Sequence, residues 1–462
     1  MMNWTGKKVV VIGAARQGLA LARYLAQKGA QVVLNDQRPV VQLEAARQAL
    51  ADLPPAAQAR LTWVCGGHPL GLLDDADLVC PSGGVPLELP LVLEAQRRGV
   101  PLSNDSQIFL QECPCRTIGI TGSAGKTTTT TLLGRMARLA GQAWVGGNIG
   151  SPLLSVVDEM QPGDLAVIEL SSFQLEIMSL STDVAVVLNI TPNHLDRHST
   201  MEAYTAAKAR LVTCQSAGGV AVLGRDDPGA WALRNQAAGQ VVSFGMQRPP
   251  HGEPGAFVQG EMIYWWDGQA EMEILPLTHI HLRGAHNVQN VLAACAAGIS
   301  AGLLPEHMQA ALDGFSGVPH RLEFVGEWGG AAWYNDTIAS APERSMAAIR
   351  SFDEPIVLLA GGRDKNLPWE DFAALVHQRV DHLILFGEAA EKIAQAVGSV
   401  QPGSRPYSIQ RCAGLQQAVW AAARVIQPGD VVLLSPGGTS FDEFRDFEER
   451  GEVFRKWVSE LS

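Results

Sequence analysis

The sequence lacks several features that mark other classes of protein. No apolar run approaches the ~18 residues that a membrane span requires, and residues 1–8 lead into a strand-like run without the architecture of a signal peptide. The seven cysteines show no metal-ligand spacing, and Cys113 and Cys115 are too close together for a zinc pair. A formal net charge of −12 lacks the basic excess that nucleic acid binding needs. We therefore expect a cytoplasmic protein with reduced thiols and neither a membrane nor a nucleic-acid partner.

What the sequence does contain is typical of a large α/β protein. Its 462 residues, 47% of them hydrophobic, suggest three domains at one per roughly 150 residues. Apolar β-branched runs alternate with helix-period stretches, as in βαβ units around parallel sheets. A Cys-Pro-Cys segment at 111–116 and a Gly-Val-Pro segment at 317–319 read as linkers. They predict domains over residues 1–112, 113–317 and 318–462.

Strands are expected where the apolar runs end at polar clusters. They are predicted over residues 117–121, 165–170, 184–190 and 219–223 in the second domain, over 332–335, 356–360, 382–386 and 430–434 in the third, with a small β excursion over 247–273.

The first block has the strand, glycine turn and helix of a nucleotide-binding unit. A strand over residues 8–12 is followed by Gly13, Gly18 and a helix, and a second strand over 31–35 ends in Asp36. The turn lacks the middle glycine of the dinucleotide fingerprint. An NAD-linked oxidoreductase is therefore disfavoured against a Rossmann-like scaffold whose glycines permit tight packing.

The strongest motif is the run TGSAGKTT over residues 121–128, between a predicted strand and a predicted helix. Its glycines let backbone N–H groups converge on phosphate oxygens, and the helix N-terminus adds a favourable dipole. Lys126 is placed to reach the β- and γ-phosphates, and Thr127 to ligate Mg²⁺. The run is one residue shorter than the common Walker pattern, so a glycine turn with a chance lysine is the alternative. Its context favours a central domain of the P-loop ATPase type.

Three further residues are ambiguous on their own. Glu169 ends a predicted strand, where Mg²⁺ or a salt bridge would have to compensate a buried carboxylate. His194 follows another strand, but a lone loop histidine is more often a packing residue than a ligand. Lys208 lies on a predicted helix and would ordinarily be a solvated cation.

Taken together, these motifs resemble the Mur ligases of bacterial cell-wall synthesis, over essentially the whole chain. The resemblance is closest to members that add glutamate to UDP-N-acetylmuramoyl-L-alanine. It implies a monomeric, ATP-dependent acid–amino-acid ligase that works through an acyl phosphate with two Mg²⁺ ions, between Rossmann-like N- and C-terminal domains. D-Glutamate is the favoured amino acid. The alternatives are L-glutamate, a relative such as folylpolyglutamate synthase, and, as a different class, a nucleotide-sensing regulator.

The same resemblance assigns ATP and the metals to specific residues. The ATP ligands it implies are Gly122, Ser123, Gly125, Lys126, Thr127, Thr128, Asn287, Asn290, Arg321 and Asp336. The catalytic and metal-binding residues it implies are Lys126, Thr127, Glu169, His194 and Lys208, the last as a carbamate.

The two remaining substrates are assigned in the same way. The UDP substrate is expected at Asp36, Gln37, Arg38, Gly84, Asn148 and Ser171. Glutamate is expected at Ser340, Lys365, Ser440 and Phe447. Two positions depart from the family's pattern: Asn193 stands where an aspartate is usual before the loop histidine, and Ile338 stands where a lysine is frequent.

Overall fold

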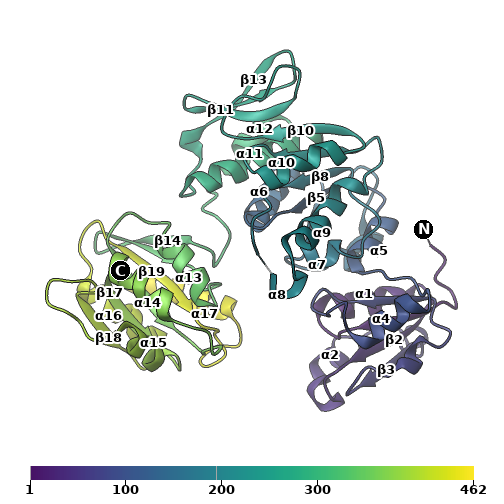
Figure 1. Cartoon of the computed structure of the whole chain (residues 1–462), viewed down its shortest axis with the longest axis horizontal. Helices are drawn as coiled ribbons and strands as arrows, with labels where there is room; N and C mark the ends of the chain where they lie inside the picture. Colours follow the sequence, from purple (N-terminus) through teal and green to yellow (C-terminus); the bar gives the residue numbers. More distant parts are fainter. Residues whose placement is uncertain (1, 194, 462) are drawn as a thin grey trace. The chain divides into compact units, whose positions relative to one another are not determined.

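The computed structural model describes residues 2–193 and 195–461. The chain divides into two compact units, one formed by the residues up to His281 with Ala285–Gly314, the other by Leu282–Gly284 with the residues from Phe315 onward. Three sheets carry helices, which confirms the predicted α/β class (Figure 1). The domain boundaries after residues 112 and 317 stay a prediction. Within the described residues, no helix is long and apolar enough to cross a membrane.

The first sheet is parallel throughout, in the order β3-β2-β1-β4. Strand β1 (Lys8–Ile12) has its predicted bounds, and β2 (Gln31–Asp36) is one residue longer than predicted. Strands β3 (Leu61–Cys65) and β4 (Leu78–Pro81) were not predicted. The other elements of this part are α1 (Arg16–Gln27), η1 (Val40–Gln42), α2 (Glu44–Gln48), α3 (Pro55–Gln58), η2 (Leu70–Leu73), α4 (Pro90–Arg97) and α5 (Asp105–Glu112).

The glycine turn after β1 is a tight packing device. Gly13 has a φ of +98°, which favours glycine. A Cβ atom at Gly18 would lie 1.9 Å from the carbonyl oxygen of Gly13. Both glycines are therefore required for α1 to start directly above the strand, as the scaffold interpretation expects.

The second sheet has nine strands in the order β13-β12-β11-β10-β9-β8-β5-β7-β6. The strands from β6 to β11 run parallel, and the antiparallel β11, β12 and β13 confirm the predicted β excursion. The strand bounds are β5 Arg116–Thr121, β6 Ala143–Gly147, β7 Leu165–Glu169, β8 Val184–Val187, β9 Val220–Gly224, β10 Gln240–Phe244, β11 Gly255–Gln259, β12 Met262–Trp266 and β13 Glu271–Pro276. Strand β8 ends three residues before the predicted residue 190.

Helices surround this sheet and connect its strands (Figure 1). They are α6 (Lys126–Ala140), η3 (Leu153–Glu159), α7 (Ser172–Leu175), α8 (Leu195–His198), α9 (Met201–Thr213), α10 (Pro228–Ala232), η4 (Leu233–Gln236), η5 (Leu277–His279), α11 (Ala285–Ser300) and α12 (Pro305–Leu312).

The third sheet has the order β14-β15-β19-β16-β17-β18 and is parallel except for the β14–β15 hairpin. Its strands are β14 (Glu323–Trp328), β15 (Ala331–Asn335), β16 (Ile356–Gly361), β17 (Val380–Phe386), β18 (Ser408–Arg411) and β19 (Val431–Gly437). Alternate residues of β16 enter two cores, one shared with α13 (Pro342–Ile349), α14 (Glu370–Arg379) and α15 (Ala390–Val397), the other with α16 (Leu415–Val425) and α17 (Phe447–Ser459). This doubly covered sheet is the predicted Rossmann-like arrangement, with an unpredicted antiparallel edge.

Candidate active site

The glycine-rich run forms the turn between β5 and α6, as the sequence predicted. Gly125 caps the helix with a φ of +83°. A Cβ atom there would lie 2.2 Å from Oδ1 of Asn290 on α11. Thr127 is half-buried and Thr128 is buried in the first turn of the helix. The loop therefore presents backbone amides at a helix N-terminus, which suits an anion.

Residues just after β8 hold this loop in place. The Asn189 side chain accepts a hydrogen bond from the Ala124 amide at 2.8 Å and donates to the Ala124 carbonyl at 3.2 Å. Ser123 Oγ donates to the Thr191 carbonyl at 2.9 Å and lies 3.0 Å from the Tyr204 hydroxyl. After β8, the Leu188 amide still donates to the Thr121 carbonyl of β5, and the polar groups of Asn189 and Thr191 bond to the phosphate loop.

Two lysines lie against the loop. Lys126 Nζ donates to the Gly122 carbonyl at 2.8 Å. Lys208 Nζ donates to the same carbonyl at 2.9 Å and to Thr121 Oγ1 at 3.3 Å. Lys208 is 1% exposed, and its burial, reinforced by the Lys126 cation and opposed by Glu169, places the pKa of its amine well below the usual value. Lys208 is thus a buried lysine held against the phosphate loop, and not the solvated side chain expected of a lone helix lysine.

Glu169, at the end of β7, has one carboxylate oxygen bonded and one without a partner. Asn148 Nδ2 donates to Oε1 at 2.9 Å, whereas the buried Oε2 accepts no hydrogen bond from the described residues. A buried carboxylate oxygen without a donor is costly unless a cation meets it. The arrangement fits Mg²⁺, a hard ion that takes carboxylate, hydroxyl and phosphate oxygens.

The predicted metal site is only partly visible. Across residues 2–193 and 195–461, no group of three or more His, Cys, Asp or Glu side chains gathers in a way that would hold a metal ion. The predicted ligand His194 lies outside the described residues. Glu169 and Thr127 remain as candidate ligands from the chain, and the assignment of all four predicted ligands stays a prediction.

At the carboxyl end of β2, Asp36 is fixed by a network of its own. Its carboxylate accepts from the Ala14 amide at 2.8 Å and from Arg38 through Nε at 2.9 Å and Nη2 at 2.8 Å. The Arg38 guanidinium holds the pKa of this carboxyl well below its usual range. Gln37 and Gly84 are exposed. These polar groups lie on the glycine-turn side of the first sheet, and their assignment to the UDP substrate stays a prediction.

Ser171 has a structural role in the described fold. It is the N-cap of α7. Its hydroxyl accepts a hydrogen bond from the Gln174 backbone amide, and its own backbone amide donates to the Gln174 side-chain oxygen. Asn148 is occupied in holding Glu169. Whether either residue also contacts the UDP substrate stays a prediction.

In the second unit, Asp336 follows β15 and is buried. Its carboxylate accepts from Ser435 Oγ at 2.8 Å and from the Leu322 amide at 3.2 Å. Burial raises the pKa of Asp336 to about 7, although the Ser435 hydrogen bond opposes the rise. A carboxyl in this state can exchange hydrogen bonds with a hydroxylated ligand at neutral pH.

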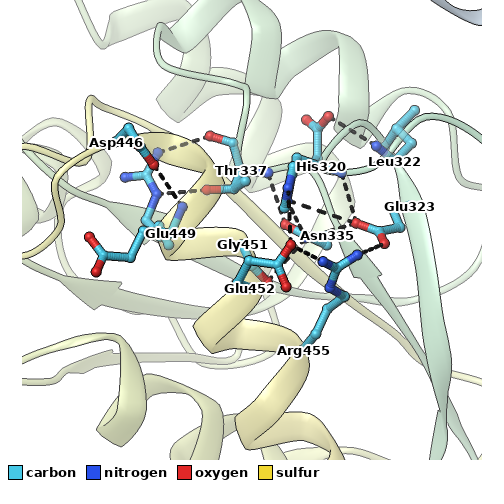
Figure 2. A network of polar contacts seen from close by, with 12 residues as sticks. His320, Leu322, Glu323, Asn335, Thr337, Asp446, Glu449, Gly451, Glu452 and Arg455 are labelled. Atoms are coloured by element: carbon cyan, nitrogen blue, oxygen red, sulfur yellow. Dashed lines mark hydrogen bonds and ion pairs between the residues drawn. The ribbon is translucent and has the colours of Figure 1, made fainter. Parts of the chain in front are cut away.

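A polar network joins His320, Glu323, Asn335 and Arg455 (Figure 2). His320 and Leu322, on either side of Arg321, have φ values of +68° and +43°. The His320 amide donates to Glu323 Oε2 at 2.7 Å, and Arg455 on α17 donates to Glu323 Oε1 at 2.5 Å. Asn335 Nδ2 donates to the same Glu323 oxygen, Oε2, at 3.0 Å. The network therefore specifies the strained turn that presents Arg321.

The residues predicted to hold glutamate lie on the loops after β15, β16 and β19 and at the start of α17. Lys365 Nζ donates to Ser340 Oγ at 3.3 Å, Ser440 is buried, and the Phe447 ring packs edge-on against His320. The fully buried Arg450 donates to Thr337 Oγ1 at 2.8 Å and to the Thr439 carbonyl at 3.1 Å. It ties the loop after β15 to the loop after β19.

Comparison with known proteins decides the family. Family models match three consecutive parts of the chain: a Mur ligase MurD-like N-terminal domain over residues 7–104, a Mur ligase middle domain over 120–298 and a Mur ligase glutamate ligase domain over 320–438. A Symbiobacterium thermophilum protein named UDP-N-acetylmuramoylalanine–D-glutamate ligase is 41% identical, covering 99% of this chain and 98% of its own length. The chain belongs to the Mur ligase family.

Other relatives of this Mur ligase agree. A Pelotomaculum thermopropionicum protein with the same name is 40% identical, covering 100% of this chain and 99% of its own length. The crystal structure of MurF from Acinetobacter baumannii shares the fold, with a TM-score of 0.57 at 19% identity, over 94% of this chain and 86% of that chain.

In this Mur ligase the structure brings together part of the predicted site. The phosphate loop, Glu169, Asn148, Lys208 and Asn290 surround one region of the first unit. Asn189, Thr191, Tyr204, Ser435 and Arg450 also shape the two regions and were not predicted. Asn189 and Thr191 could have been found from the sequence, because they follow a predicted strand and lie close to the predicted ligand His194.

Proposed function

We propose that this Mur ligase joins D-glutamate to UDP-N-acetylmuramoyl-L-alanine at the expense of ATP, as a cytoplasmic monomer supplying peptidoglycan precursor. The observation that carries the proposal is the phosphate loop with Glu169 Oε2 and the Lys208 amine beside it. The relatives named as D-glutamate ligases, which match essentially the whole chain, favour that substrate pair.

The first chemical step is phosphorylation of the terminal alanine carboxylate. The loop amides and Lys126 hold the β- and γ-phosphates, so that the carboxylate oxygen attacks the γ-phosphorus in line and ADP leaves. An acyl phosphate results. Two Mg²⁺ ions, held by Thr127, Glu169, His194 and carbamylated Lys208, would offset the repulsion between the two anions.

The second step forms the amide. The glutamate amine attacks the acyl carbon, the tetrahedral intermediate collapses, and inorganic phosphate leaves. Lys365 and Ser340, which already contact each other, and Ser440 with Phe447 would receive glutamate. A cation and hydroxyls suit its carboxylates because charge-assisted hydrogen bonds are strong.

The surroundings of Lys208 support the proposal that it is carbamylated. A neutral amine attacks carbon dioxide, loses a proton and becomes an anionic carbamate. Burial and the Lys126 cation already favour the neutral amine. The carbamate would place a second anionic ligand near Glu169, where a second metal ion would sit.

The nucleotide ends of both substrates have candidate partners. Asp36, Gln37, Arg38 and Gly84 would receive the UDP group, with Asn148 and Ser171 toward the muramoyl-alanine arm. Asn287 and Asn290 are the candidate ATP ligands of the first unit, and Arg321 and Asp336 are those of the second. Asn290 already supports the phosphate loop at Gly125, so its contribution includes shaping the loop.

Release of ADP by the full chain tests the proposal. It should require Mg²⁺, UDP-N-acetylmuramoyl-L-alanine and D-glutamate together, and L-glutamate should not substitute. Lys126→Ala should abolish release, whereas the exposed Lys7→Ala should not. Release with L-glutamate or with a folate would support a sibling ligase instead. Nucleotide binding without substrate-dependent release would support a regulator.

A further inference from the structure

Two thiols face each other in the linker between α5 and β5. Cys113 is the residue that ends α5, and Cys115 directly precedes β5, with only Pro114 between them. The Sγ atoms lie 3.5 Å apart. All seven cysteines are present as free thiols, so the proximity arises from the local fold and not from an existing bond.

The two thiols differ in exposure and acidity. Cys113 is partly exposed, whereas Cys115 is 7% exposed and belongs to the hydrophobic core. The hydrogen bond with Cys115 lowers the pKa of the Cys113 thiol, and the same contact with burial raises the pKa of Cys115. A partly exposed thiol with a lowered pKa beside a second, protected thiol is the arrangement found in redox-reactive cysteine pairs.

We propose that Cys113 and Cys115 are a redox-active dithiol that hydrogen peroxide converts reversibly to an intramolecular disulfide. The Cys113 thiolate attacks one peroxide oxygen, the O–O bond breaks, and the departing hydroxide takes up a proton to leave as water. The Cys115 sulfur then attacks the Cys113 sulfenic acid, the S–O bond breaks, and a second water leaves. In sum, two thiols lose two hydrogens and one peroxide becomes two waters.

The geometry allows the second step with a small movement. The sulfurs must approach from 3.5 Å to the roughly 2.05 Å of a disulfide. The neighbouring Met160 Sδ lies 4.0 Å from Cys113 Sγ, but a thioether forms no disulfide. Cys115 is therefore the resolving thiol, and its burial protects it from oxidation before Cys113 reacts.

The test uses the native full chain and the tryptic peptide 99–116, which contains these two cysteines and no other. After peroxide treatment and quenching, iodoacetamide labels the remaining thiols. We expect this peptide to lose both label groups and to be lighter by two hydrogens, and dithiothreitol to restore both labels. The readout is a mass, so it is independent of whether the proposed ligase activity is found.

Two variants separate the roles of the thiols. Cys115→Ser should leave a Cys113 sulfenic acid that dimedone traps, and Cys113→Ser should leave Cys115 unmodified at the same dose. The half-buried Cys412, which lies in the second unit, is an internal control for general thiol oxidation. If peptide 99–116 keeps both thiols at a dose that oxidises Cys412, or accumulates sulfinic acid without a disulfide, the pair has no such chemistry.

Discussion

Replacing Asp336 by asparagine should stabilise the second unit at high pH and weaken ATP binding at the same time. The Asp336 carboxyl is 5% exposed, and the structure provides two neutral donors for it, the Ser435 hydroxyl and the Leu322 amide. Ionising this carboxyl in the folded state is therefore unfavourable. Asparagine keeps the shape and removes the charge.

The magnitude follows from the pKa of Asp336, which rises from the usual 3.8 to about 7 on folding. The folded state then binds more protons than the unfolded state between these pH values, so the free energy of unfolding falls as the pH rises through the window. The contribution is fully present below pH ~4, and about 4 kcal/mol is lost above pH ~7. Roughly 2 to 3 kcal/mol of this loss falls between pH 5 and 8.

Hydrogen exchange of β16 and β19 across a urea series reports the stability of this unit. Relative to the wild type, the free energy of unfolding of Asp336→Asn should gain roughly 2 to 3 kcal/mol between pH 5 and pH 8. The control is Asp381→Asn, which removes the ion-pair partner of Arg405 at 2.8 Å and should destabilise at both pH values.

A difference between wild type and Asp336→Asn that does not change with pH would refute this account of the buried carboxyl. The same variant should raise the KM for ATP if Asp336 contacts the ribose. An unchanged KM would remove Asp336 from the ATP site while leaving the stability argument intact.

Three further substitutions probe the loop and the metal site. Glu169→Gln should raise the Mg²⁺ concentration required and lower kcat on the order of 100-fold, because the amide cannot replace a charged ligand; ADP release titrated with Mg²⁺ measures this. Gly125→Ala should abolish ATP binding in calorimetry, since its Cβ would lie 2.2 Å from Asn290. The control is Gly141→Ala at the other end of the helix, which should bind ATP normally because its Cβ would have no atom within 4 Å. Asn189→Ala should raise the KM for ATP roughly tenfold with a smaller change in kcat, because the lost hydrogen bonds hold the loop; steady-state kinetics separates the two effects.

The sequence predicts the phosphate loop of the first unit better than it predicts the residues that hold this loop in place. The phosphate loop could be located because glycines at fixed spacing between a strand and a helix are a local signal. Lys208 could not be placed by its own helix, because its burial depends on the phosphate loop, whose bonded residue Gly122 is 86 residues away in the sequence. The hydrogen bonds of Asn189 likewise depend on its contact with this loop, which is distant in the sequence.

The strands also divide into those that the sequence predicts and those that it does not. The buried central strands β1 and β16 were predicted because continuous apolar runs mark strands covered on both faces. Strand β3 was missed because its residues are mostly half-exposed, and β14 because it lies at the sheet edge and only its first residue, Glu323, is buried. Edge strands carry less hydrophobic signal than central ones.

In the proposed mechanism, the alanine carboxylate takes the γ-phosphoryl group before glutamate attacks. Substrate labelled with ¹⁸O in that carboxylate tests it directly, by mass spectrometry of the inorganic phosphate released during turnover with D-glutamate. The account predicts one ¹⁸O atom in each phosphate formed. Unlabelled phosphate released in step with amide formation would contradict it.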